Sequence, residues 1–190
     1  MPHLLPLFVT LTGRRVVLVG GGRVAATKFE QLVATGADVR VVAPQVVREI
    51  EKAGAEIVRR PFEPTDLDDA WFAVAAAPPE VNRAVSQAAE ARHVFVNAAD
   101  DPANASAFLS GVVRRDGVTV AISTGGDAPA LAGLLREALD DVLPDDLDRW
   151  MSAARERRLG WKRDGVEMER RRPLLLEALN ELYGSTRATS

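Results

Sequence analysis

Apolar and polar positions follow two alternating periods along the first hundred residues. Short apolar runs typical of strands occur at 15–20, 37–44, 55–62, 71–77 and 93–99. Between them, apolar residues recur at helical spacing from Val24 to Gly36 and within 46–53 and 79–91. Strands that alternate with helices pair in parallel, with helices on both faces of the sheet. The pattern therefore predicts an α/β fold over residues 1–108, a doubly wound parallel sheet of the Rossmann-like kind.

The pattern changes beyond residue 108. Within 106–124, two runs rich in β-forming residues flank Arg115-Asp116-Gly117, which indicates a hairpin. A glycine pair at 125–126 and Pro129 then introduce a helix, and from Pro144 onward only helical periodicity remains. We therefore expect a small α+β segment over 109–144 and a C-terminal helical segment over 145–190.

A run of three glycines follows the first predicted strand. Gly20-Gly21-Gly22-Arg23-Val24-Ala25 satisfies G-x-G-x-x-A, follows a strand and opens a helix. In that setting Gly20 permits the tight turn, Gly22 lets a phosphate approach the backbone, and the helix directs unpaired N–H groups at a pyrophosphate. The segment predicts a nicotinamide dinucleotide site that includes Gly20, Gly21, Gly22, Arg23 and Val24. A glycine-rich turn that binds nothing is the alternative.

The second and fourth predicted strands contribute less specific signals. The second strand ends at Val42-Ala43-Pro44-Gln45, where an Asp or Glu would hold the ribose of NAD. Backbone groups or Gln45 must then hold that ribose, so the sequence does not decide between NAD and NADP. The segment 75–79 offers small residues suited to lie against the cofactor. We add Ala43, Pro44, Gln45, Ala76 and Ala77 to the predicted cofactor site.

Two adjacent acids follow the fifth predicted strand. In Asn97-Ala98-Ala99-Asp100-Asp101-Pro102 only one of the aspartates can face the ligand edge of the sheet, because neighbouring residues of a strand point to opposite sides. A carboxylate there can accept a proton while a nicotinamide accepts a hydride. Asp before Pro is also typical of an ordinary turn, and this alternative stays open on the residues alone.

Composition narrows the classes of function. The 190 residues include no cysteine, which excludes disulfides, thiolate zinc sites and iron–sulfur clusters. Net charge is −3, with 15 basic and 21 acidic residues over 1–150 but 9 and 6 over 151–190. An acidic chain with few aromatic residues argues against nucleic-acid binding. The sequence has neither a signal peptide nor an apolar run long enough for a bilayer, so we expect a cytoplasmic protein with no membrane contact.

Four stretches together resemble a known family. These are the run 5–44, which begins LPLF and contains GGGRVA, then PEVNRAVSQAAE, VNAADDP, and VTVAISTGGDAPALAGLLREAL. Over Leu5–Leu143 they are similar to the precorrin-2 dehydrogenases, also found as the N-terminal part of siroheme synthases. The resemblance implies NAD-dependent dehydrogenation of precorrin-2 to sirohydrochlorin, and a homodimer formed through 109–144. Some members also insert ferrous iron into the product, and the sequence leaves this second activity open.

The resemblance also assigns roles to residues. It makes Asp100 the catalytic acid–base group, with Asn97 of the same motif near the substrate, together with Ser123, Thr124, Gly125 and Gly126. The chain departs from the family at Ala77-Pro78, where many members have Thr-Asp, which changes how the nicotinamide half is held. No cluster of residues has metal-ligand spacing, so no resident metal is expected. His3 and His93 lie away from the predicted ligand edge and are read as surface residues.

Two other functions stay open. A non-enzymatic NAD(H)-binding regulatory module would share the strand, the glycine turn and the helix, although it would normally keep the acid after the second strand. A short oxidoreductase for another small substrate is the other, although the chain lacks the Tyr-x-x-x-Lys pair of the commonest type.

Overall fold

The computed structural model describes residues 4–184, and within them the chain forms two compact units. The first unit comprises the residues up to Ser110 together with Ser123–Pro129. The second comprises Gly111–Ile122 and the residues from Ala130 onward. The division into 1–108, 109–144 and 145–190 stays a prediction, and we describe each compact unit by itself.

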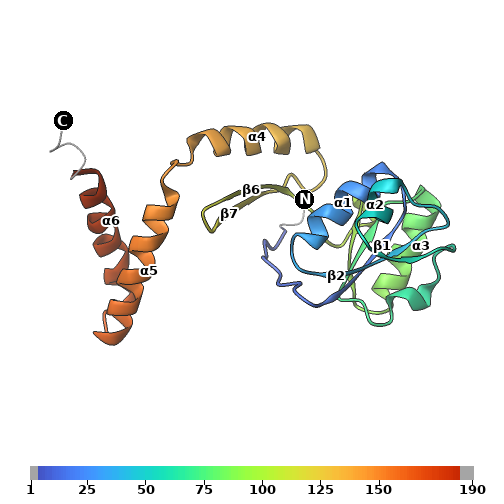
Figure 1. Ribbon diagram of the computed structural model, residues 1–190, viewed down its shortest axis with the longest axis horizontal. Coiled ribbons are helices and arrows are strands. Elements are labelled where there is room, and N and C mark those ends of the chain that lie inside the picture. The colour runs from blue at the N-terminus through green and yellow to red at the C-terminus, as the bar shows by residue number, and fades with distance from the viewer. Residues whose placement is uncertain (1–3, 185–190) are drawn as a thin grey trace. The chain divides into compact units, whose positions relative to one another are not determined.

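The first unit is built on a parallel five-stranded sheet (Figure 1). Its strands lie in the order β3-β2-β1-β4-β5, and every neighbouring pair is parallel. This confirms the predicted doubly wound, Rossmann-like fold. The strands are β1 (Arg15–Val19), β2 (Asp38–Val42), β3 (Glu56–Val58), β4 (Phe72–Ala75) and β5 (Phe95–Ala98).

Helices cover both faces of this sheet. On one face, α1 (Arg23–Val33) and α2 (Arg48–Lys52) bury Phe29, Leu32 and Ile50 against alternate residues of β1 and β2. On the other face, α3 (Pro79–Glu90) buries Val85, Ala88 and Ala89. Because strand residues alternate between faces, the predicted apolar runs of β1, β2 and β4 supply both cores.

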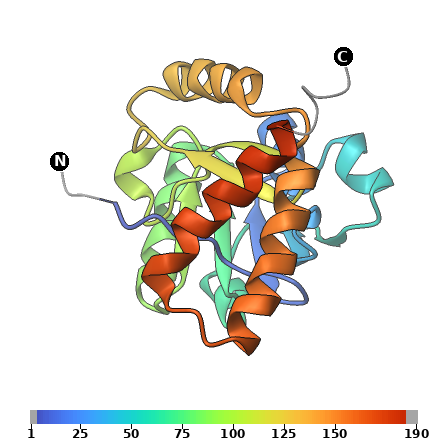
Figure 2. The same cartoon turned by 90° about the vertical axis from the view of Figure 1, so that its left-hand side faces the viewer.

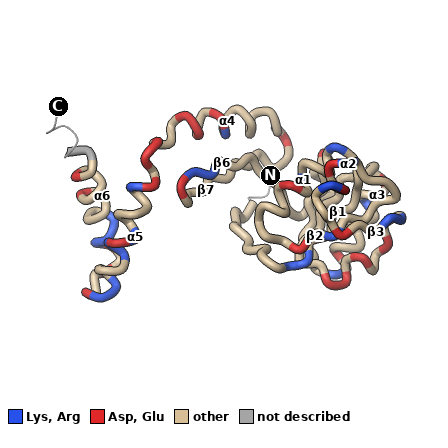
Figure 3. The backbone as a smooth tube through the Cα atoms, viewed as in Figure 1, with Lys and Arg blue, Asp and Glu red and all other residues tan. Residues whose placement is uncertain are grey.

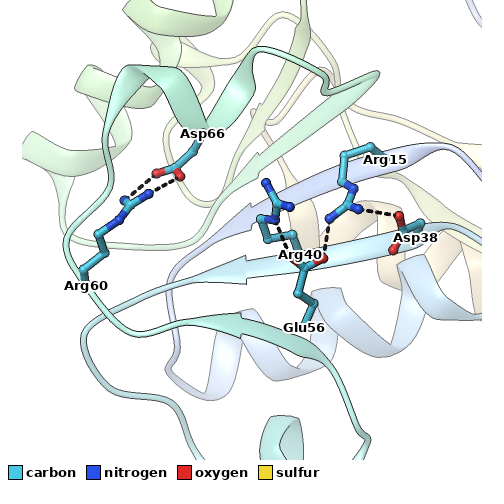
Figure 4. A network of polar contacts seen from close by, with 6 residues as sticks. All are labelled: Arg15, Asp38, Arg40, Glu56, Arg60 and Asp66. Carbon is cyan, nitrogen blue, oxygen red and sulfur yellow. Dashed lines mark hydrogen bonds and ion pairs between the residues drawn. The ribbon is translucent and has the colours of Figure 1, made fainter.

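Ion pairs tie the amino ends of the first three strands together (Figure 4). Arg15 on β1 pairs with Asp38 on β2 at 2.8 Å and also with Glu56 on β3. Arg40 on β2 reaches Glu56 at 2.8 Å. Burial raises the pKa of Glu56, but hydrogen bonds from Arg15 and Arg40 lower it by a larger amount. The pKa of Glu56 therefore lies below its ordinary value.

A second charged pair organises the connection from β3 to β4. Arg60 donates two hydrogen bonds to Asp66, at 2.6 and 2.9 Å, and the backbone N–H of Glu63 donates a third at 2.9 Å. Asp66 is buried in the short 3-10 helix η1 (Pro64–Leu67). The predicted strand over 55–62 is therefore too long: β3 stops at Val58, and Arg60 is held by η1 instead of by the sheet.

The second unit contains a hairpin and three helices. Strands β6 (Gly111–Arg115) and β7 (Val118–Ile122) pair antiparallel around Asp116-Gly117, as predicted. The helices are α4 (Pro129–Val142, whose first residue is grouped with the first unit), α5 (Leu147–Arg163) and α6 (Met168–Gly184). Helices α5 and α6 pack side by side (Figure 2), and many positions along them are Lys or Arg (Figure 3). No helix of the described residues is both long and apolar enough to cross a membrane.

Candidate functional site

The glycine turn after β1 is packed against two neighbouring loops. Gly20 has φ +130°, and a Cβ on it would overlap the carbonyl oxygen of Ala76 after β4. A Cβ on Gly21 would overlap the carbonyl oxygen of Gln45 after β2. A Cβ on Gly22 would meet nothing within 4 Å. Gly20 and Gly21 are therefore required by the packing of the fold, whereas Gly22 faces open space.

Helix α1 begins at this turn with its first amides uncapped. Gly22 is the N-cap residue, no side chain caps the helix, and its first turn contains no acidic residue. The first two residues of the helix, Arg23 and Val24, are exposed, and 47% of Val24 is accessible. A helix N-terminus with unpaired N–H groups and no local anion favours a bound phosphate. The described residues thus fit the pyrophosphate of a dinucleotide.

The loop after β2 contributes mainly backbone. The side chain of Ala43 is buried in the core. Its backbone N–H donates to the carbonyl of Val58 at 3.1 Å. Pro44 and Gln45 are exposed beside the glycine turn. Val47 donates its N–H to the carbonyl of Gly21 at 2.8 Å, which holds the two loops together. No acidic side chain stands in this loop, as the sequence indicates.

The loop after β4 is held by a side chain that the sequence analysis did not select. The N–H of Ala76 donates to Val19 at 2.8 Å, and that of Ala77 donates to Oδ1 of Asn82 at 3.0 Å. Asn82 lies in α3 and is only 3% exposed. Its signal in the sequence is weak, because an Asn in the first turns of a helix is common on any surface. Its role is to fix the backbone of Ala76 and Ala77 at the carboxyl edge of the sheet.

The two aspartates after β5 differ in their surroundings. Asp101 caps the 3-10 helix η2 (Pro102–Asn104) and accepts a hydrogen bond from Nδ2 of Asn104 at 2.8 Å. Asp100 is exposed, and no hydrogen bond or ion pair holds its carboxylate within residues 4–184. Asp100 also has φ +56°, in the left-handed region that few residues other than glycine adopt. Asp101 is therefore the residue that forms an ordinary turn before Pro102, whereas the carboxylate of Asp100 has no hydrogen-bond partner among the described residues.

Asn97 lies below these aspartates, near the end of β5. It is 7% exposed and donates from Nδ2 to the carbonyl of Ala107 at 3.0 Å. Its Oδ1 is buried and has no hydrogen-bond partner within the described residues. Asn97 is in register with Val74 of β4, a residue of the core beneath α1, so its side chain leaves the sheet on the α1 face. An unpaired buried acceptor is costly and marks a place where a donor is missing.

The stretch Ser123–Gly126 forms a tight turn next to η2. Ser123 Oγ accepts from the N–H of Gly125 at 3.2 Å, and Thr124 Oγ1 accepts from the N–H of Ala128 at 3.2 Å. A Cβ on Gly126 would lie 2.8 Å from Cγ of Pro102. The turn is therefore brought next to the segment that follows Asp100, although more than twenty residues separate the two in sequence.

One charged side chain near Asp100 was missed by the sequence analysis. Lys28 of α1 is half-buried, and burial lowers the pKa of its ammonium, while the carboxylate of Asp100 acts in the opposite direction. No local signal identifies this residue, because the carboxylate that interacts with it belongs to Asp100, which is distant along the chain.

Other candidate positions lie away from this edge. His93 is exposed in the turn before β5, and His3 lies outside the described residues. Among the described residues no group of three or more His, Asp or Glu side chains could hold a metal ion. A hollow of about 300 Å³ is bordered by Phe29, Val39, Ala55 and their neighbours, and none of the predicted site residues lines it.

A family profile described as "Putative NAD(P)-binding" matches residues 7–111, more than half of the chain. The chain belongs to this NAD(P)-binding family. The match covers the glycine turn, the loops after β2 and β4, and Asp100. The family assignment agrees with an uncapped α1 N-terminus beside an open Gly22.

Two curated relatives extend the comparison. The chain is 40% identical to siroheme synthase 2 of Cronobacter sakazakii over 177 residues, which are 90% of this chain and 38% of that protein. It is 43% identical to siroheme synthase 2 of Klebsiella pneumoniae over 149 residues, or 76% of this chain and 32% of the relative. The chain thus spans well under half the length of these relatives.

A solved structure matches at nearly full length. SirC, a precorrin-2 dehydrogenase, superposes with a TM-score of 0.71 at 27% identity, covering 92% of this chain and 88% of SirC. The resemblance to siroheme synthases and precorrin-2 dehydrogenases predicted from the sequence motifs is therefore confirmed.

Proposed function

We propose that this protein dehydrogenates precorrin-2 to sirohydrochlorin, with NAD as the hydride acceptor. The observation that carries the proposal is the match to a precorrin-2 dehydrogenase over 92% of this chain and 88% of that protein. This match includes the NAD(P)-binding portion of the chain. The similarity to siroheme synthases supports the same substrate. A protein of that pathway has to remove two hydrogens from a reduced tetrapyrrole, one as hydride and one as proton.

The residues divide the chemistry between two parts of the carboxyl edge. When bound, the nicotinamide ring supplies the hydride acceptor. Gly22 and the uncapped amides of α1 hold the pyrophosphate, with Arg23 and Val24 beside it, and the backbone around Ala43, Pro44 and Gln45 holds the ribose. Ala76 and Ala77, fixed by Asn82, lie against the cofactor.

Asp100 accepts the proton in this proposal. Its carboxylate is exposed and not engaged by a hydrogen bond within the described residues, so it is free to act as a base. Asn97 lies three residues before this aspartate, and the turn Ser123–Gly126, with Thr124 and Gly125, packs against Pro102 just after it. In this proposal both contact the substrate. Asp101 is engaged with Asn104 and takes no part in the reaction.

The test is direct. Purified protein is incubated anaerobically with NAD and precorrin-2, and the absorbance of reduced nicotinamide is followed. NADP is tested in parallel, because the loop 43–47 after β2 contains neither an acidic nor a basic residue. Formation of NADH with sirohydrochlorin in equal amounts supports the proposal. An NAD-binding protein that forms no NADH would instead be a regulatory module, and turnover of a different small substrate would identify another oxidoreductase.

A second proposal is insertion of ferrous iron into sirohydrochlorin. The supporting observation is the free carboxylate of Asp100, which can accept the two pyrrole protons that the metal displaces in turn. Iron is then a substrate, and the macrocycle supplies its four nitrogen ligands. Anaerobic addition of Fe²⁺ or Co²⁺ to sirohydrochlorin, with and without the protein, tests it. Equal rates in the two reactions would eliminate this activity.

We also propose that the protein forms a homodimer through 109–144. Helix α4 carries several large apolar side chains that are exposed within one chain, among them Leu131, Leu134 and Val142, which are 50, 65 and 77% accessible. A second copy of the chain that covers them removes this apolar surface from water.

A further inference from the structure

We propose that Lys28 is a substrate-binding residue that pairs with a carboxylate of the tetrapyrrole. This inference rests on the function proposed above, and it assigns an anion-binding position to a residue with no other role in that site. The supporting observations are the place of Lys28 on α1, its lack of an ion-pair partner among residues 4–184, its electrostatic interaction with Asp100, and the unpaired acceptor of Asn97.

Lys28 stands at the margin of the buried face of α1. It follows the buried Ala25 by three residues and precedes the buried Leu32 by four, so all three lie along one side of the helix. The side chain is half-buried, whereas Thr27 and Glu30 on the other side of the helix are exposed. The side chain of Lys28 is therefore partly withdrawn from solvent.

The charge of Lys28 is incompletely compensated. Burial lowers the pKa of its ammonium, and the carboxylate of Asp100 counteracts part of that effect. Yet within residues 4–184 no carboxylate lies within ion-pair distance of Lys28, Asp100 included. A partly desolvated cation without a direct partner gains free energy when an anion binds beside it.

The same face of the sheet also offers an unpaired acceptor. Oδ1 of Asn97 is buried without a hydrogen-bond partner, and the side chain of Asn97 leaves β5 on the α1 face. A cation and an unpaired acceptor suit a ligand that carries both carboxylates and N–H groups. A polycarboxylated tetrapyrrole has both kinds of group, on its periphery and on its pyrrole nitrogens.

The cofactor's phosphates are a poorer match for Lys28. Those phosphates belong at Gly22 and the first amides of α1, and Lys28 lies six residues further along, about 9 Å of helix rise. Its charged neighbour is the proposed base, Asp100, which belongs to the substrate side of the edge. The substrate carboxylate is therefore the anion that the position favours.

Steady-state kinetics of the full chain test the inference with three variants. Lys28→Met removes the charge and keeps the length, Lys28→Arg keeps the charge, and Lys52→Met makes the same change at an exposed lysine of α2. We expect Lys28→Met to raise KM for precorrin-2 about tenfold, the loss expected for one charge-assisted contact. The kcat and the KM for NAD should change less than about twofold. Lys28→Arg should restore most of the affinity, and Lys52→Met should match the unmodified protein.

Three results would overturn the inference. An unchanged KM for precorrin-2 removes the contact. A raised KM for NAD assigns Lys28 to the cofactor. A fall in kcat at constant KM shows that Lys28 acts through Asp100.

A binding measurement separates this inference from the proposed function. Uroporphyrin, a polycarboxylated tetrapyrrole that the reaction does not consume, is titrated into the full chain without NAD, and its fluorescence is followed. If the unmodified protein forms no NADH but Lys28→Met still weakens uroporphyrin binding about tenfold, the proposed function fails and the anion site stands. If NADH forms but Lys28→Met binds uroporphyrin as tightly as the unmodified protein, the anion site fails and the proposed function stands.

Discussion

The backbone of Gly21 abuts the carbonyl oxygen of Gln45 so closely that no side chain fits between the end of β1 and the loop after β2. Its neighbour Gly22 has open space where a Cβ would stand. Consecutive glycines of one motif thus differ: Gly21 is required where two loops pack together, whereas Gly22 borders open space at the N-terminus of α1.

Alanine at each of the two positions should separate these roles. We expect Gly21→Ala to lower the free energy of unfolding by more than about 2 kcal/mol, because backbone must move to admit the Cβ. Gly22→Ala should unfold within about 1 kcal/mol of the unmodified protein but bind NAD at least about tenfold more weakly. Chemical denaturation and calorimetric titration with NAD measure the two effects. Normal NAD affinity in Gly22→Ala would show that the pyrophosphate does not approach this turn.

Replacement of Asp100 by Asn should remove activity without disturbing the fold. Asn adopts positive φ at least as readily as Asp, so the backbone at φ +56° is preserved. Loss of the proton acceptor should lower kcat by about a hundredfold or more. The matched change Asp101→Asn keeps an oxygen for the hydrogen bond from Asn104 and should leave kcat within a few fold. Equal losses in both variants would mean that the turn, and not the carboxylate, matters.

Stability should depend on the charge of Lys28 with a defined sign. Because burial lowers its pKa in the folded state, folding is penalised while the ammonium is charged, and the penalty fades as pH rises towards the ordinary value of 10.5. Lys28→Met should therefore be more stable than the unmodified protein near neutral pH, by less than about 1 kcal/mol because the group is half exposed. The difference should shrink in alkaline solution. Denaturation curves at several pH values would contradict this if the gap widened with pH.

Asp66 should make the stability of the protein depend on pH in acid solution, whereas Lys28 does so in alkaline solution. Burial raises the pKa of Asp66, but the hydrogen bonds from Arg60 and Glu63 lower it more, so the folded pKa lies below 3.8. Its contribution is complete above that value and is lost as pH falls through the folded pKa. We expect Asp66→Asn to cost about 1–2 kcal/mol at neutral pH, and less in acid.

Asp69 supplies the control for this experiment. It is exposed in the same connection, and Asp69→Asn should unfold like the unmodified protein throughout. If Asp66→Asn lost the same stability at every pH, the carboxylate charge would not be its source.

The proposed dimer can be tested at α4. Leu134→Glu places a charge on the exposed apolar side of this helix, and we expect it to shift the protein to monomers in sedimentation equilibrium. Leu159→Glu makes the same change at an equally exposed leucine of α5, outside 109–144, and should keep the dimer. Dissociation by Leu159→Glu alone would place the interface elsewhere.

Local pattern was sufficient to predict the architecture of the first unit and the hairpin. Alternation of strands and helices gave five parallel strands, and Asp116-Gly117, with φ +49° and +84°, formed the tight turn that this dipeptide favours. Local pattern overestimated the length of β3, because Arg60 is drawn out of the strand by Asp66, an interaction of side chains that no periodicity records.

Site residues could be predicted from the sequence where the backbone conformation or packing admits only one residue type. The glycine turn is such a case, whereas Lys28 and Asn82 are not. The neighbour of Lys28 is Asp100, distant along the chain, and Asn82 acts on the backbone of Ala77 across a loop. Such relationships depend on how strands are ordered in space, which the sequence analysis described only as parallel.

The ion pairs that join Arg15, Asp38, Arg40 and Glu56 lie at the amino ends of the strands, and the glycine turn lies at the carboxyl ends. The ion pairs that stabilise the sheet and the turn proposed to bind the cofactor thus lie at opposite edges of the sheet. The charged pairs of the first edge can therefore be altered to change heat tolerance, while the groups proposed to bind NAD and the tetrapyrrole stay as they are.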